Sequence, residues 1–261
     1  MQDLFDICAC SSDEEQTTPT MPLIGDMAPE FTAESTNGTI HFPQDYAGKW
    51  VVLFSHPSDF TPVCTSEFMA FQALQDELAE INTALIGLSV GSVSSHLAWI
   101  DAIKKIKWNG WENLEITFPV IDDVSKAVAN KYGMIHPNAS DTHTVRAVFI
   151  IDPHGIIRAI LYYPASTGRN FDEIKRMLIA LQTTDALKVS TPADWMPGDD
   201  VLISAPTTST DMRRAMQNMS RPGNTNVQAW FFTFKKLPVD EIYNKIHKRD
   251  TTTKKKSKNV A

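Results

Sequence analysis

One cysteine, Cys64, occupies the position in this sequence where a thiol is most reactive. It follows an apolar run at 50–54 (WVVLF) and precedes an amphipathic run at 66–81. The first run predicts a buried strand and the second a helix, so Cys64 lies near the first turn of that helix. Unpaired backbone N–H groups and the positive end of the helix dipole favour a thiolate there. The sequence therefore predicts nucleophilic thiol chemistry at Cys64.

Residues near Cys64 supply what attack on a peroxide requires. Such attack needs an oxygen held in line with the sulfur and donors that stabilise the departing oxygen. Thr61 can place a hydroxyl beside the sulfur, where it donates to the thiolate or accepts from a hydroperoxide. Pro57 and Pro62 stiffen the loop, and Pro57 shields the sulfur from water without adding a donor. Arg146 begins a strand of the same sheet, where its cation favours the thiolate and binds the peroxide oxygen.

Two other interpretations of this segment compete with a reactive thiol. Free cysteines are often buried structural residues, but a threonine, two prolines and a helix start surround Cys64. A thioredoxin-type dithiol enzyme needs a Cys-x-x-Cys pair, and Thr61 stands where the first of those cysteines would be. Disulfide exchange by this loop alone is therefore not expected. Considered singly, Arg146 and Arg169 are more typical of solvated surface residues.

Composition and charge narrow the class of protein. The 261 residues are 43% hydrophobic, which allows a sizeable core in one large domain or two unequal ones. No apolar stretch approaches the roughly 20 residues that cross a bilayer, and the N-terminus lacks the features of a secretory signal. We therefore expect a cytoplasmic protein with no membrane partner. A net charge of −7 argues against nucleic acid as a partner.

The cysteine count excludes a disulfide scaffold. Cys8, Cys10 and Cys64 cannot all pair within one chain. A Cys-x-Cys pair with no second cluster is a poor zinc site, because zinc takes four ligands. We expect no metal site.

The pattern of runs predicts an α/β sheet with mixed strand directions. Strands are expected at 50–55, 84–90, 117–121, 145–152 and 156–163, and helices at 66–81, 94–106, 125–132 and 171–181. The helix at 94–106 should present Leu97, Ile100, Ile103 and Ile106 on one side. Asn37-Gly38 suits a tight turn between short strands, and the short link 153–155 makes the last two strands an antiparallel hairpin.

The chain divides into four expected parts. Residues 1–22 are acidic and polar and predict a mobile extension, 23–185 form the α/β domain, 190–245 form a smaller C-terminal domain, and 246–261 form a basic disordered tail. In the smaller domain, methionines recur at helical spacing at Met212, Met216 and Met219. The aromatic segment 229–234 (AWFFTF) is either core or a subunit interface.

The motif Pro57-x-x-x-Thr61-x-x-Cys64 resembles the active-site signature of peroxiredoxins. Residues 55–67 (SHPSDFTPVCTSE) are most similar to the Prx6 subfamily, including its archaeal and bacterial members. The likeness runs from about residue 23 to about residue 238. Further matching segments are 132–136 (YGMIH), 144–152 (TVRAVFIID), 159–164 (AILYYP) and 167–170 (TGRN).

This resemblance implies a thioredoxin-like fold with a smaller C-terminal peroxiredoxin domain. It implies a thiol-dependent peroxidase that reduces hydrogen peroxide and organic hydroperoxides in antioxidant defence, with no metal or organic cofactor. By resemblance, Cys64 is the peroxidatic cysteine, oxidised to sulfenic acid, and Thr61, Pro57 and Arg146 complete its pocket. The remaining site residues implied are His56 beside the sulfur, Arg169 as a second arginine near the pocket and Glu67 as a residue that orients the arginines.

The resolving thiol and the assembly stay open. The archaeal relatives carry cysteines in the C-terminal aromatic segment, whereas 227–234 has none here. Either an external thiol reduces Cys64 (a thioredoxin-, glutaredoxin- or glutathione-like donor), or Cys8 or Cys10 resolves it from a mobile arm. The resemblance also implies homo-oligomers, as dimers or decameric rings. A chaperone-like assembly is the alternative function, and phospholipase activity is discounted.

Overall fold

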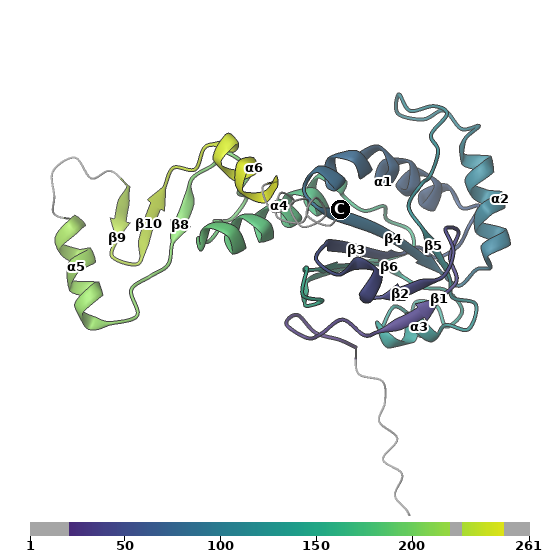
Figure 1. Cartoon of the computed structure of the whole chain (residues 1–261), viewed down its shortest axis with the longest axis horizontal. Coiled ribbons are helices and arrows are strands. Elements are labelled where there is room, and N and C mark those ends of the chain that lie inside the picture. Colours follow the sequence, from purple (N-terminus) through teal and green to yellow (C-terminus); the bar gives the residue numbers. More distant parts are fainter. Residues whose placement is uncertain (1–20, 220–225, 248–261) are drawn as a thin grey trace, which may run out of the picture.

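A computed structural model describes residues 21–219 and 226–247 of the chain. They form an α/β domain from which a C-terminal arm projects to one side (Figure 1). The predictions for Cys8, Cys10 and the tail beyond residue 247 lie outside the described residues.

A five-stranded mixed sheet forms the centre of the α/β domain. Its strands are β3 (Trp50–Ser55), β4 (Thr83–Ser89), β5 (Val120–Asp122), β6 (Arg146–Ile151) and β7 (Ile157–Tyr163), in the spatial order β5-β4-β3-β6-β7. β3 pairs parallel with β4 and antiparallel with β6. The mixed directions confirm the prediction, as does the antiparallel pairing of β6 with β7.

The central strand β3 is buried on both faces of the sheet. Trp50, Val52 and Phe54 join one apolar cluster, and Val51 and Leu53 join the other. This alternation is the period of two expected of an extended chain. The first cluster includes side chains of α1 (Pro62–Glu80), α2 (Val93–Ile103) and α4 (Phe171–Leu187). The second includes side chains of the hairpin β1–β2 (Phe31–Ala33, Ile40–Phe42) and of α3 (Ala127–Lys131), and η1 (Gln44–Tyr46) follows the hairpin.

All four predicted helices differ from their predicted bounds, α3 by two residues at its start and one at its end. α1 begins at Pro62 rather than at 66, because proline suits the first helical position, where no N–H bond is lost. α2 ends at Ile103 and buries His96 and Trp99 beside Ile100 and Ile103. The predicted apolar side was therefore partly wrong, since Leu97 is 48% exposed and Ile106 follows the helix. α4 continues to Leu187.

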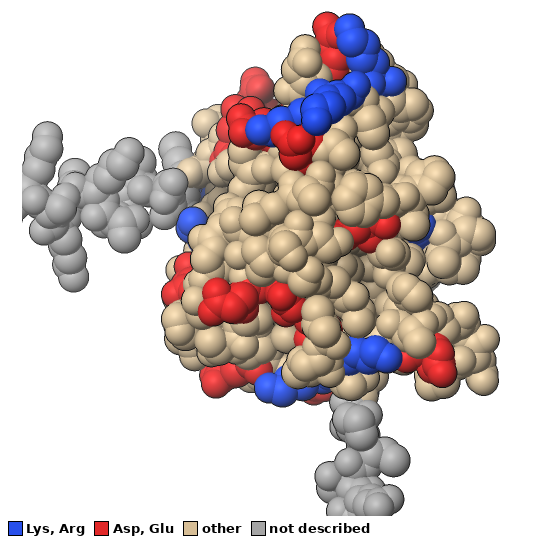
Figure 2. Space-filling model, turned by 90° about the vertical axis from the view of Figure 1, so that its right-hand side faces the viewer, with Lys and Arg blue, Asp and Glu red and all other residues tan. Residues whose placement is uncertain are grey.

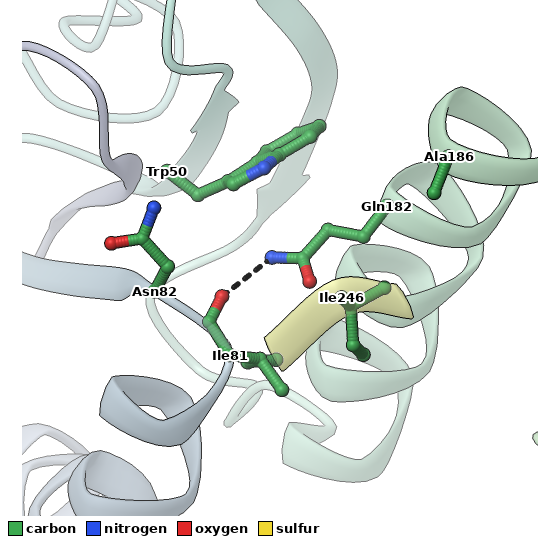
Figure 3. A pocket seen from close by; sticks show the side chains of 6 residues that line it. All are labelled: Trp50, Ile81, Asn82, Gln182, Ala186 and Ile246. Carbon is green, nitrogen blue, oxygen red and sulfur yellow. Dashed lines mark hydrogen bonds between the residues drawn. The ribbon is translucent and has the colours of Figure 1, made fainter. Parts of the chain in front are cut away.

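The C-terminal arm contains a small sheet and two helices. Its elements are β8 (Val201–Ile203), α5 (Ser209–Met219), β9 (Val227–Ala229), β10 (Phe232–Lys235) and α6 (Val239–His247), with strand order β8-β10-β9. α6 buries Ile242 and Ile246 in the same apolar cluster as α4. Next to this contact, the Gln182 amide of α4 donates to the Ile81 carbonyl at 2.9 Å (Figure 3). The apolar contact of α6 attaches the base of the arm to the α/β domain, and the Gln182 bond holds α4 against the end of α1.

The outer part of the arm leaves its apolar side chains uncovered. α5 buries no residue. Within the predicted aromatic segment, Phe231 is 57% and Phe232 41% exposed, and neither Trp230 nor Phe234 is buried. The core interpretation of this segment was therefore wrong. A contiguous set of exposed apolar residues indicates an interaction surface.

The domain surface carries charges of both signs in mixed groups on the face in Figure 2. Near the end of α2, Lys104 pairs with Glu115 at 2.8 Å and Lys107 pairs with Glu112. Such exposed pairs contribute little to stability. Among residues 21–219 and 226–247, no helix is both long and apolar enough to cross a membrane.

Candidate active site

The loop after β3 delivers Cys64 into the first turn of α1. Thr61 caps the helix in an extended conformation and Pro62 starts it, so Cys64 lies where the backbone N–H groups have no helical acceptor. Phe60 just before it has a φ of 56° and is 60% exposed. A non-glycine residue in this conformation is costly and typical of functional loops. Cys64 itself has 0% exposed surface and is a free thiol.

A guanidinium group faces the sulfur. Arg146, the first residue of β6, lies with Nη1 at 3.3 Å from Cys64 Sγ and at 2.7 Å from Glu67 Oε2. Two further bonds to the Ala165 carbonyl, at 2.7 and 3.2 Å, fix the plane of the guanidinium. Glu67 is one helical turn after Cys64, so the same face of α1 carries both the thiol and the carboxylate that orients Arg146.

Arg169 forms the second half of this buried cluster. Its side chain donates to Glu67 Oε1 at 3.0 Å and to Oε2 at 2.7 Å, and its backbone N–H donates to Oε1 at 2.9 Å. Nη1 donates to the carbonyls of Ser55 and Ala147, both at 3.0 Å. Burial lowers the pKa of Arg169, and the Glu67 carboxylate opposes that shift. Arg169 thus anchors Glu67 to strands β3 and β6.

The cluster beside Cys64 carries a net positive charge. Arg146 and Arg169 carry one positive charge each and Glu67 one negative charge, and the side chains of all three are at most 2% exposed. The sum is one positive charge in a low-dielectric interior, where an unbalanced charge is costly. The Cys64 sulfur lies against this charge, 3.3 Å from Arg146 Nη1.

Hydroxyl groups hold the loop against β6. Thr144 Oγ1 donates to the His56 carbonyl at 2.7 Å, and Ser55 Oγ donates to the Val145 carbonyl at 2.6 Å. Thr61 Oγ1 donates to the Ser58 carbonyl at 2.9 Å. The hydroxyl proton of Thr61 is therefore engaged within the loop, and its oxygen lone pairs stay available to accept. Pro57 is half-buried in the same loop.

His56 belongs to a hydrogen-bonded group that the sequence did not reveal. Its Nε2 lies 3.0 Å from Asp59 Oδ1, and Asp59 also contacts Ser95 and His96 at the start of α2. Burial lowers the pKa of His56, against the opposing effect of Asp59. Burial alone raises the pKa of Asp59, but the hydrogen bonds from His56, His96 and Ser95 lower it below the usual range.

The structure thus brings most predicted site residues together. Cys64, Arg146, Glu67 and Arg169 form one connected cluster. The residues that sequence reasoning missed are Asp59, Ser95 and His96. Asp59 lies within the matching segment 55–67, but no local sequence pattern links it to α2, which begins more than 30 residues further on.

Comparison with known proteins identifies the family. Residues 24–160 match the AhpC/TSA family, and residues 180–217 match the C-terminal domain of 1-Cys peroxiredoxin. A peroxiredoxin of Methanosarcina mazei is 57% identical over 217 residues, which cover 83% of this chain and 98% of that protein. The chain belongs to the peroxiredoxins. It is a thiol-dependent peroxidase with a thioredoxin-like fold.

Other relatives and solved structures agree. The peroxiredoxin of Archaeoglobus fulgidus is 46% identical over 220 residues, covering 83% of this chain and 99% of that protein. A yeast mitochondrial 1-Cys peroxiredoxin, solved to explain thiol resolution by glutathione and thioredoxin systems, superposes with a TM-score of 0.70 at 41% identity over 83% of this chain and 100% of the other. A mutant of peroxiredoxin 6 of Arenicola marina superposes with a TM-score of 0.69 at 33% identity, over 83% of this chain and 99% of the other.

Proposed function

We propose that Cys64 is the peroxidatic nucleophile of this peroxiredoxin. Its thiolate attacks the O–H oxygen of a hydroperoxide, so that an S–O bond forms as the O–O bond breaks. The electron pair of the broken bond leaves with the other oxygen, which takes up a proton to give water or an alcohol, and the sulfur becomes a sulfenic acid. The contact of Arg146 with the sulfur inside a net-positive buried cluster carries the proposal.

The neighbouring residues have separate roles in this proposal. Arg146 stabilises the thiolate and the negative charge on the departing oxygen. Thr61 accepts from the hydroperoxide O–H, since its own proton is engaged with Ser58. Pro57 shields the sulfur, and Glu67 with Arg169 orients Arg146. By its likeness to the family motif, His56 is the proposed neighbour of the sulfur and its oxidised forms. Hydrogen peroxide and organic hydroperoxides are the proposed substrates.

The proposed reductant is an external thiol protein or glutathione. In the yeast mitochondrial 1-Cys peroxiredoxin, the thiol is resolved via glutathione and thioredoxin systems. This chain has no cysteine in 65–261 that could resolve Cys64. Cys8 and Cys10 are the alternative resolving thiols. Such a cycle requires a supply of reduced thiols, which the cytoplasm provides, so we propose a cytoplasmic location and a role in antioxidant defence.

The proposed assembly is a homo-oligomer, a dimer or a decamer built from dimers. The apolar residues that the arm leaves exposed support it, and these are Ile203, Met216, Met219, Phe231, Phe232 and Val239. Their exposed fractions lie between 37% and 57%. A second copy of the chain would cover them.

Single-turnover oxidation tests the nucleophile. We expect the wild type to consume one equivalent of hydrogen peroxide rapidly and Cys64→Ser to consume none. The matched control is the double variant Cys8→Ser, Cys10→Ser, which should retain this first oxidation. Equal rates for wild type and Cys64→Ser would overturn the proposal.

Mass spectrometry under non-reducing conditions separates the two resolving mechanisms. After one equivalent of peroxide, a sulfenic acid that traps added thiols supports the external reductant. A disulfide between Cys64 and Cys8 or Cys10 supports the N-terminal thiols instead and contradicts the proposed reductant.

A further inference from the structure

Asp59 connects the peroxidatic loop to α2 through buried hydrogen bonds. Its Oδ2 accepts from Ser95 Oγ at 2.6 Å and lies 2.8 Å from His96 Nδ1, and its Oδ1 lies 3.0 Å from His56 Nε2. The imidazoles of His56 and His96 have 0% exposed surface, and Asp59 has 9%. A buried network of this kind specifies geometry when its members are satisfied.

The donors are assigned by what each ring nitrogen faces. His96 Nδ1 faces the Asp59 carboxylate and His96 Nε2 faces the Ile121 carbonyl at 3.1 Å. Both partners only accept, so an imidazolium satisfies both contacts. His96 and Asp59 then form a buried charge pair.

The same reasoning fixes the tautomer of His56. Its Nε2 faces the Asp59 carboxylate and must carry a proton to bond with it. Burial and the positive charges of His96 and Arg169 keep the ring neutral. The Nδ1 atom therefore bears a lone pair, and it has no hydrogen-bond partner among the described residues although it is buried. A buried acceptor without a partner is unusual and suggests a function.

Asp59, His56 and His96 could also be considered as metal ligands because their donor atoms cluster. The atoms that face one another stand only 2.8 to 3.0 Å apart, which are hydrogen-bond distances. Tetrahedral zinc ligands at about 2.0–2.2 Å from the ion stand about 3.3 Å or more apart. His96 Nε2 is also engaged with a carbonyl. The geometry is that of a hydrogen-bonded network.

We infer that Asp59 is a positioning residue of the peroxidase reaction: it holds His56 as the neutral Nε2–H tautomer and so leaves Nδ1 as a buried acceptor directly after β3, on the loop that leads to Cys64. This inference rests on the proposed role of His56. An acceptor there can bind the O–H of a hydroperoxide or of the sulfenic acid. The carboxylate of Asp59 acts only through the imidazole, as the third group of a nucleophile–base–orienter set does.

Nitrogen-15 NMR of the full-length protein tests the tautomer directly, because protonated and unprotonated imidazole nitrogens differ in chemical shift. The His56 signals are assigned by their loss in His56→Gln. We expect wild-type His56 to be neutral with its proton on Nε2, and Asp59→Asn to move part of that proton to Nδ1, since the amide can also donate. A wild-type His56 protonated at Nδ1 overturns the inference whatever the variants do.

The rate of Cys64 oxidation provides the second readout. Removing the orienting carboxylate should lower the second-order rate constant about tenfold or more. Asp123→Asn is the matched control, since Asp123 is also a buried carboxylate but caps α3 through Val128 and Ala129. It should leave the tautomer and the rate unchanged. If Asp59→Asn does not fold, Ser95→Ala serves as the second variant. It removes one donor to Asp59 and should lower the rate constant less.

The outcomes separate this inference from the proposed function. A wild type that reacts rapidly while Asp59→Asn shifts the tautomer without slowing the reaction overturns the role of Asp59 and leaves Cys64 as the nucleophile. A wild type that reacts no faster than Cys64→Ser overturns both.

Discussion

At the scale of single residues, Glu67 has the most consequential contacts. Its carboxylate lies between the guanidinium groups of Arg146 and Arg169, and its side chain is 2% exposed. The same helix carries Glu77, which pairs with Lys175 at the surface. In both places a glutamate carboxylate contacts a cationic side chain, but only Glu67 and its partners are shielded from water. Their free energies should therefore differ strongly.

Replacing Glu67 with glutamine should lower the free energy of unfolding by about 3–5 kcal/mol, because it leaves two buried cations without a counter-charge. Glu77→Gln is the matched control and should change it by less than about 1 kcal/mol. Urea denaturation measures both. Similar small effects of the two substitutions would show that the cluster is more hydrated than its burial indicates.

His56 should make stability depend on pH in a defined direction. Because the folded state holds the pKa of His56 below its ordinary value near 6.5, the unfolded chain binds more protons below that pH. The free energy of unfolding therefore falls as pH decreases from about 6.5, with a limiting slope of about 1.4 kcal/mol per pH unit. Urea midpoints of wild type and His56→Gln between pH 7.5 and 5.5 should diverge accordingly. His143→Gln, at an exposed histidine, should retain the wild-type slope.

The sequence predicted the residues of the Cys64 cluster better than those of the Asp59 network. Arg146 and Glu67 could be carried over because they stand in continuous matching segments. The contact of Asp59 with His96 joins residues 37 apart. No periodicity or spacing encodes a contact that depends on how α2 packs against the loop, so only the folded structure reveals it.

At the scale of elements, the starts of two helices position the site. Pro62 starts α1 just before Cys64, and Asn170 caps α4 just after Arg169, accepting from the Glu173 N–H at 3.1 Å. The strand and helix order was predictable from apolar periodicity. The start of α1 was predicted four residues late, because Pro62 was interpreted as part of the loop rather than as the first residue of the helix.

Substituting Asn170 with alanine should cost about 1 kcal/mol, because the N–H of Glu173 loses its acceptor. Asn170→Asp is the conservative control, since a carboxylate also accepts this bond and suits the helix N-terminus. We expect its urea midpoint to stay near that of the wild type. A loss as large in the aspartate variant would show that the side chain acts by something other than capping.

At the scale of the whole molecule, the arm carries apolar residues of two kinds, those buried against the α/β domain and those left exposed. α6 buries Ile242 and Ile246 against the α/β domain, whereas Phe231 and Phe232 are exposed within the same chain. Composition alone could not decide between core and interface for this segment, because both need the same residue types. What decides it is that the arm projects from the domain, so that β9 and β10 lie away from the α/β core (Figure 1).

The double variant Phe231→Ser, Phe232→Ser should reduce the mass of the assembly measured by sedimentation velocity. The thermal stability of the α/β domain should change little, because these side chains are exposed in the single chain. Leu97→Ser is the control, as Leu97 is 48% exposed on α2, outside the arm. An unchanged mass of the double variant would locate the subunit contact elsewhere.

The complete enclosure of the Cys64 sulfur sets an entry requirement for every reagent that reaches it. Neither an oxidant nor a reducing thiol can touch the atom until the residues that enclose it move aside. Bulkier reagents need wider excursions, which occur more rarely. Alkylating agents of increasing size should therefore modify Cys64 at decreasing rates. Each rate reports how often the fold opens wide enough to admit that reagent.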